Sequence, residues 1–167
     1  TPTRSQLMTG KYQIRLGMQD SVIHATEPRG VPLEHDFVSE TLQAQGYATY
    51  LVGKWHLGMF TSDYIPTSRG FDSFYGILTG GGGHYDHQTT SSFDPRGGYG
   101  DYEMVANNLW EDDAAVTDEN QPSTEVHTTT MYTDQALAYI TDQPADEPFF
   151  MYLSYQAVHG PIQADER

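Results

Sequence analysis

The sequence predicts an α/β domain with a largely parallel sheet and flanking helices. Helix-like and strand-like segments alternate along the chain, which is the order that such sheets require. The second strand-like segment, residues 149–155 (FFMYLSY), is apolar over nearly its whole length. Continuous apolar runs of this kind are typical of strands buried on both faces of a parallel sheet. The first strand-like segment, 47–52 (YATYLV), is rich in the aromatic and branched residues that strands favour.

Three helices are expected, at 3–9, 37–45 and 128–142. Gly10 and Gly46 can end the first two, because glycine readily adopts the left-handed conformation that follows a helix. Asp36 precedes the second helix and is its expected N-cap. In the third helix the apolar side chains recur at the helical period.

The polar stretch 79–102 contains four consecutive glycines and predicts a long surface loop. Loops of this length often carry function, so part of the stretch, from residue 80 to residue 101, is expected at the mouth of a site.

Composition excludes several classes of function. The chain has 167 residues with 8 basic and 23 acidic side chains, a net charge of −15. Nucleic acid is not an expected partner, because phosphate binding depends on clustered lysine and arginine. A polyanionic substrate is also disfavoured, unless the few cations gather in one pocket. Cysteine is absent, so disulfides and cysteine metal sites are excluded within these residues. No apolar run is long enough for a membrane span.

Polar side chains follow both predicted strands, where ligands gather in α/β sheets. Lys54 and His56 come directly after 47–52, and in extended chain they share one side while Trp55 faces the other. His159 stands at the exit of 149–155. Lysine supplies charge and histidine supplies a directed donor or a proton, which suits an oxyanion.

The start of the helix 3–9 is a third anion-favouring place. Free backbone N–H groups and the helix dipole attract negative charge there. Arg4 lies one turn inside, on the face shared with the residue that would precede Thr1. Together with Lys54, His56 and His159 it could form a pocket for a sulfate or phosphate ester.

Two further clusters allow two interpretations each, a metal site or a plain surface loop. His84 and His87 are spaced for a zinc site on a helix, but the glycines before them disfavour a helix, so a solvated loop is expected. Asp112 and Asp113 suggest a calcium site, and a solvated acidic loop is again the simpler interpretation. The four glycines are not a phosphate loop, because no Gly-Lys-Ser/Thr follows them.

Several segments resemble the signatures of the sulfatase family. Residues 1–12 (TPTRSQLMTGKY) are similar to its first signature, in which cysteine or serine precedes x-Pro-Ser-Arg and a Leu-Thr-Gly-Arg-Tyr segment follows. Thr3 and Lys11 are mild departures. Residues 46–58 (GYATYLVGKWHLG) match the second signature closely. Residues 155–161 (YQAVHGP) resemble the segment with the family's later active-site histidine. The arylsulfatase B group, with N-acetylgalactosamine-4-sulfatase, is the most similar in character.

The resemblance implies a partial alkaline-phosphatase-like domain, so residues 1–167 would be part of a single catalytic domain truncated at both ends. It implies hydrolysis of sulfate esters, of sulfated sugars in particular, by a formylglycine lying just before Thr1 and made by a maturation enzyme. By position, Arg4 would steady the formylglycine, Lys54 would bind sulfate, and His56 would hydrogen-bond the aldehyde hydrate. His159 would contact the ester and assist the leaving group. A calcium ion would hold the sulfate through ligands outside this chain, so no metal ligand is assigned here.

Two alternatives remain at this point. One is a phosphate- or phosphonate-ester hydrolase of the same superfamily, and the other is a non-catalytic homologue that binds sulfated glycans. The compartment also remains open, since family resemblance allows a lysosomal, secreted or periplasmic protein.

Overall fold

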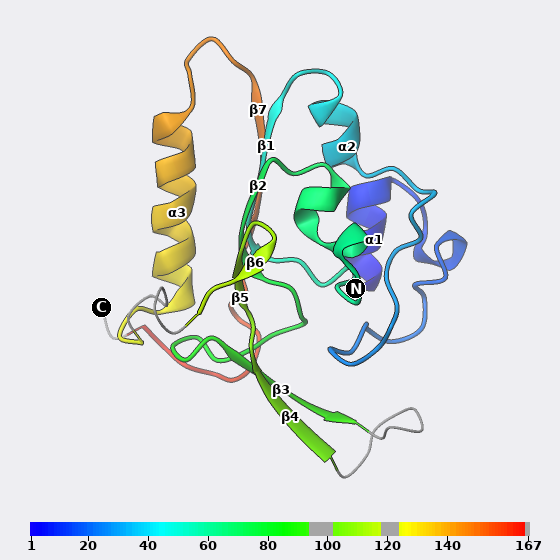
Figure 1. Ribbon diagram of the computed structural model, residues 1–167, viewed down its shortest axis with the longest axis vertical. Coiled ribbons are helices and arrows are strands. Elements are labelled where there is room, and N and C mark those ends of the chain that lie inside the picture. Colours follow the sequence, from blue (N-terminus) through cyan, green and yellow to red (C-terminus); the bar gives the residue numbers. More distant parts are fainter. Residues whose placement is uncertain (94–101, 118–123, 166–167) are drawn as a thin grey trace.

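The computed structural model describes residues 1–93, 102–117 and 124–165, which form a sheet with helices on both faces (Figure 1). The α-helices are α1 (Pro2–Thr9), α2 (Val38–Gln43) and α3 (Thr128–Asp142), and short 3₁₀ turns lie at Gln13–Arg15, Ser62–Tyr64 and Pro66–Arg69. The strands are β1 (Ala48–Lys54), β2 (Ser73–Ile77), β3 (Gln88–Phe93), β4 (Tyr102–Asn107), β5 (Leu109–Glu111), β6 (Ala114–Ala115) and β7 (Phe149–Ser154). None of the described helices has the length and apolarity to cross a bilayer.

The main sheet has the strand order β6-β5-β2-β1-β7. β1 pairs in parallel with both β2 and β7, so the ends of β1 and β7 that carry the polar motifs lie at the same edge. β5 pairs antiparallel with β2. It also pairs antiparallel with β6, because a tight turn at 112–113 reverses the chain between them. The predicted α/β class is therefore confirmed, with a mixed sheet.

Alternation along β1 divides the core into two layers. Leu51 points to the face covered by α1 and α2, where it joins a cluster that includes Trp55 and Phe74. Val52 points to the opposite face and packs with Tyr132 of α3. Successive side chains of a strand point to opposite faces, so a central strand with helices on both sides is apolar throughout.

Two expectations about element ends and burial were wrong. The N-cap of α2 is Phe37, not Asp36, and the Glu40 carboxylate accepts the Phe37 N–H at 2.6 Å. The buried ring of Phe37 sets this start, since tertiary packing outweighs the local capping preference of aspartate. Strand β7 was expected to be buried on both faces. Within the described residues it is the outer strand next to β1, and Phe149 is 40% exposed.

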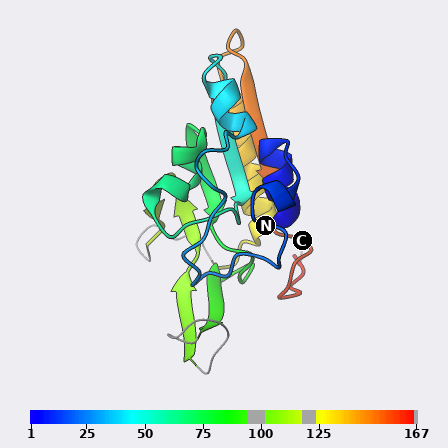
Figure 2. The ribbon, with the colours of Figure 1, turned by 90° about the vertical axis from the view of Figure 1, so that its right-hand side faces the viewer.

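The described part of the stretch 79–102 also contains regular structure where a loop was expected. It contains β3, which pairs antiparallel with β4 in a two-stranded hairpin that extends away from the main sheet (Figures 1 and 2). Residues 94–101 of the predicted loop lie outside the described residues. Polar strands such as β3, with the sequence QTTSSF, escape a pattern search that looks for buried apolar runs.

Candidate functional site

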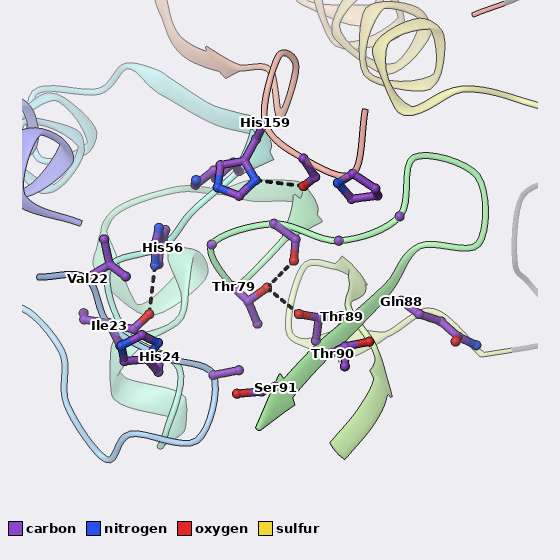
Figure 3. A pocket seen from close by; sticks show the side chains of 18 of the residues that line it. Val22, Ile23, His24, His56, Thr79, Gln88, Thr89, Thr90, Ser91 and His159 are labelled. Atoms are coloured by element: carbon purple, nitrogen blue, oxygen red, sulfur yellow. Dashed lines mark hydrogen bonds between the residues drawn. The ribbon is translucent and has the colours of Figure 1, made fainter. Parts of the chain in front are cut away.

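A cavity of about 760 Å³ lies where β1 and β7 end (Figure 3). Its lining comes from the start of α1, the loop 22–25, the end of β1, the glycines 80–83, strand β3 and the loop after β7. Lys54, His56 and His159 all line it, so the structure brings together three of the four residues singled out from the sequence. Trp55 faces the core, as the alternation predicted.

Lys54 is the final residue of β1, and its side chain is buried. Burial disfavours the charged ammonium, and the nearby Arg4 adds repulsion, so that the pKa of Lys54 falls from 10.5 to about 8. An anion in the cavity would therefore meet a cation that is poorly solvated by water. Such a cation binds an anion more strongly than an exposed lysine does.

His56 is buried and has a defined tautomer. Its Nε2 lies 2.8 Å from the Ile23 carbonyl, so Nε2 carries the hydrogen and Nδ1 carries the lone pair. Nδ1 is buried and has no hydrogen-bond partner among the described residues. Burial first, with repulsion from the nearby Lys54, lowers the pKa of His56 below its usual value. The ring is thus a neutral acceptor at physiological pH.

Thr1 joins the start of α1 to this histidine. Its hydroxyl donates to the His56 carbonyl at 3.1 Å and accepts the Ile23 N–H at 2.9 Å. These bonds hold the N-terminal end of α1 at the cavity beside the ring. Sequence reasoning did not single out Thr1 or the loop at Ile23, because neither carries a pattern beyond ordinary residue types.

Arg4 does not line the cavity. Its Nη1 donates to the Lys54 carbonyl at 3.1 Å, to the Tyr152 hydroxyl at 2.8 Å and to the Ser154 hydroxyl. The guanidinium thereby connects α1 to the ends of β1 and β7, behind Lys54. Its geometry favours a role in holding the backbone of the site.

His159 differs from the other two cavity side chains in being exposed. Its Nδ1 lies 2.8 Å from the Gly160 carbonyl, so Nδ1–H donates and Nε2 is left available (Figure 3). Gly80 and Gly81 lie against the two imidazoles. A Cβ on Gly80 would come within 2.7 Å of the His56 ring, and one on Gly81 within 2.8 Å of the His159 ring.

A polar network holds these glycines. Asn108 Nδ2 donates to the Thr79 hydroxyl at 2.7 Å and to the Gly81 carbonyl at 3.3 Å, and the Thr79 hydroxyl donates to the Gly81 carbonyl at 3.0 Å. The expectation that the Gly-rich stretch borders the site is confirmed for the described glycines and for Gln88, Thr89, Thr90 and Ser91 of β3. The run of glycines predicted this loop from the sequence, whereas no sequence pattern indicated a role for Asn108.

The His84–His87 segment is not a solvated loop, because both imidazoles are buried. His84 instead stacks on His127, with ring centroids 4.4 Å apart and planes within 9°. No group of three or more His, Asp or Glu side chains suited to a metal ion occurs among the described residues. Asp112 is the turn residue between β5 and β6, and its carboxylate accepts the Phe74 N–H at 2.8 Å.

Calcium prefers roughly six to eight oxygen ligands, mostly from carboxylates and carbonyls. Among the described residues that line the cavity, Asp86 is the one carboxylate, and its Oδ1 accepts the Gln88 N–H at 3.1 Å. Cationic and imidazole groups surround the rest of the inner end. The described residues therefore do not form a calcium cage, and no chemical step below uses a metal.

These features define a class: an α/β domain with a cationic cavity at the strand ends, suited to an anionic ester. The model of the sulfatase family matches residues 1–167, and the chain belongs to that family.

Relatives and solved structures agree with this assignment. Mouse arylsulfatase J is 41% identical over 167 residues, which is all of this chain and 26% of that protein. Mouse N-acetylgalactosamine-6-sulfatase is 32% identical over 175 residues and is covered over 32% of its length. The crystal structure of Ps i-CgsB in complex with k-i-k-neocarrahexaose matches 98% of this chain and 35% of that one, with a TM-score of 0.71 and 27% identity. The chain thus spans about a quarter to a third of the relatives it matches.

Proposed function

We propose that the protein containing this chain hydrolyses sulfate esters of sugars at the cavity described above. The observation that carries the proposal is the meeting of Lys54, His56 and His159 in one cavity beside the start of α1. The names of N-acetylgalactosamine-6-sulfatase and of the k-i-k-neocarrahexaose complex of Ps i-CgsB support sugars as the substrate class. The name of arylsulfatase J supports sulfate-ester hydrolysis alone. The finer resemblance to arylsulfatase B is part of this proposal.

The inner end of the cavity suits the sulfate group. The Lys54 ammonium is buried, and the N-terminal end of α1 adds positive potential from its backbone N–H groups. The non-bridging sulfate oxygens carry negative charge, and further charge develops on the ester oxygen as the S–O bond breaks. Fixed cationic groups stabilise such charge most where water is excluded. Arg4 keeps Lys54 in place through its bond to the Lys54 carbonyl.

The two imidazoles are suited to opposite proton transfers. We propose that the residue before Thr1 is formylglycine and that one hydroxyl of its aldehyde hydrate attacks the sulfur. His56 is neutral and its Nδ1 has no partner among the described residues, so it can accept the proton of that hydroxyl. His159 in its protonated form can give the Nε2 proton to the leaving oxygen. One S–O bond forms, the S–O bond of the ester breaks, and the leaving alcohol departs with that proton.

The outer end of the cavity suits a sugar. Thr89, Thr90 and Ser91 of β3 present hydroxyl groups there (Figure 3), and the aromatic rings among the described lining residues are histidines. Hydroxyl side chains can donate to and accept from the hydroxyls of a sugar. An aryl leaving group would instead favour apolar and aromatic walls.

The test requires the full-length protein, produced with the formylglycine-generating maturation enzyme. Peptide mass spectrometry identifies the residue before Thr1, and sulfate release is measured from sulfated mono- and oligosaccharides and from the matching phosphate esters. Formylglycine with sulfate release is the expected result, and residues 1–167 alone are expected to be inactive.

Other outcomes contradict the proposal in different ways. A preference for phosphate esters would favour the phosphohydrolase alternative. Glycan binding without turnover, or a residue other than cysteine, serine or threonine at that position, would indicate a non-catalytic homologue.

A further inference from the structure

The loop that carries His159 rests on two stacked histidines outside the cavity. His84 follows the glycine run, and His127 is the N-cap of α3. Both are buried, although neither belongs to a signature noted in the sequence. Their rings lie parallel with centroids 4.4 Å apart, and Tyr85 packs edge-on against His127.

Each ring donates to a different carbonyl of the loop after β7. His84 Nε2 lies 3.4 Å from the His159 carbonyl, and His127 Nε2 lies 3.0 Å from the Gln163 carbonyl. Because a carbonyl can only accept, both Nε2 atoms carry hydrogen. The Gln163 side chain also bonds to this segment, because its Oε1 accepts the backbone N–H of His84 at 2.7 Å.

The other nitrogen of each ring accepts from the start of α3. The Thr128 hydroxyl donates to His84 Nδ1 at 2.6 Å, and the Thr129 N–H donates to His127 Nδ1 at 3.2 Å. The two rings therefore bridge α3 to the loop 159–163, and both bridge only as neutral imidazoles.

We infer that His84 and His127 are positioning residues that hold His159 at the cavity. The inference rests on the proposed role of His159 as proton donor. His159 is exposed, and within the described part of the chain its ring hydrogen-bonds to the adjacent Gly160 carbonyl alone, so its place depends on the backbone that carries it. Two carbonyls of that backbone are held by the stacked pair, which α3 anchors to the sheet.

Protonation would break the bridge. A proton on Nδ1 removes the acceptor for Thr128 or Thr129, and it places positive charge at the positive end of the α3 dipole. The pKa of His84 is lowered by burial, with His127 and His159 adding repulsion. His87 is also close enough to His84 to feel its charge. Further titratable groups near the pair are Tyr85, Asp86, Glu125 and Asp165, and the Asp165 carboxylate accepts the Thr130 hydroxyl at the same helix end.

The test uses the full-length protein and separates the bridge from the helix cap. His127→Asn keeps a good N-cap, but its shorter side chain cannot stack on His84 or reach Gln163. His127→Gln keeps a donor near the position of Nε2 and does not titrate. His35→Gln is the matched control, because His35 lies away from the cavity and its side chain contacts Lys11.

We expect His127→Asn to lower kcat by about tenfold, since a small displacement of a catalytic group slows chemistry. Amide hydrogen exchange within 157–163 should increase, including at His159, whose N–H now bonds to the Gln156 carbonyl at 3.0 Å. His127→Gln should keep kcat and amide exchange close to the wild-type values, because its amide can still donate to the Gln163 carbonyl. His35→Gln should match the wild type in both measurements.

The two readouts distinguish the possible failures. Unchanged kcat and unchanged exchange in His127→Asn, in an active wild-type enzyme, would overturn the inference. If the wild-type protein released no sulfate and His127→Asn still showed faster exchange, the inferred bridge would stand and the proposed function would be wrong.

Discussion

The two walls of the cavity are built differently. The inner wall (Thr1, Lys54 and His56) is buried, and each of its members is held by bonds to neighbouring backbone or by a strand of the main sheet. The outer wall (Thr90, Ser91 and His159) lies on the hairpin and on the loop after β7, and it is more exposed. The difference teaches that the cationic and imidazole groups suited to an anion are fixed by the main sheet and by backbone bonds, whereas the hydroxyl groups suited to a sugar lie on more exposed segments.

The largest effect is expected on the inner wall, from Lys54→Ala in the full-length protein. Loss of a buried cation at a developing negative charge should lower kcat/KM by about 10²–10³-fold. Steady-state sulfate release measures this, and Lys11→Ala is the control because Lys11 is exposed and far from the cavity. Comparable activity in both variants would remove Lys54 from the site.

The glycines test whether the two walls respond differently to crowding. In Gly80→Ala the new Cβ meets the buried His56 ring at 2.7 Å, so both kcat and stability should fall, stability by about 1–3 kcal/mol. In Gly81→Ala the Cβ meets the exposed His159 ring at 2.8 Å, which can rotate away. Here kcat should fall while stability stays within about 0.5 kcal/mol. Urea unfolding and kcat are measured for both variants. Equal losses of stability in the two variants would contradict the expected difference between the buried and the exposed wall.

The pH dependence sharpens the account of the inner wall. Lys54 loses its proton near its pKa of about 8, so kcat/KM should fall as pH rises through that value. In Lys54→Arg the fall of the remaining kcat/KM should move to higher pH, because the guanidinium stays protonated. An unchanged limb in that variant would assign the limb to another group.

Stability should respond to the same group in the opposite direction. The pKa of Lys54 is about 8 in the folded chain and near 10.5 when unfolded, so the unfolded chain binds more protons between these values. The contribution of Lys54 to stability therefore rises with pH across that window. The difference between wild-type and Lys54→Met unfolding free energies, measured from pH 7 to 10.5, isolates this contribution. A difference that does not change with pH would contradict the lowered pKa.

The smallest effect is expected on the outer wall. Thr90→Ala should raise KM for a sulfated oligosaccharide by about fivefold, the loss of one hydrogen bond, and should leave a small aryl sulfate unaffected. Parallel kinetics on the two substrates provide the measurement and its control. An equal change with both substrates would mean that Thr90 acts on the sulfate end or on folding.

Regular elements with strong local patterns were predictable from the sequence. The helix 128–142 was predicted with the bounds that the structure shows for α3, because its apolar residues keep the helical period and face the sheet. The strand predicted at 47–52 corresponds to β1, and it was found because its aromatic and branched residues favour strands. In contrast, β2 is only five residues long and was missed, since its place in the sheet comes from pairing with β1.

Candidate site residues followed the same division. Lys54, His56 and His159 were found because they stand next to strand ends and within segments that resemble sulfatase signatures, and the structure brings them to one cavity. Arg4 was also singled out from the sequence, but it was expected to line the pocket. It lies behind Lys54, because Tyr152 and Ser154 offer it hydroxyl partners at the end of β7.

By itself, the sequence determined the α/β class, the main elements around the strand ends and the sulfatase-like segments, since these depend on local periodicity and on short motifs. Tertiary structure alone decided the tautomer of His56, the glycine contacts with both imidazoles and the stacking of His84 on His127. These features join residues from 24 to 78 positions apart, for example His56 with Gly80 and Gly81 with His159. Such pairs meet only when the chain folds, because bond direction, burial and close packing arise between elements and not within them.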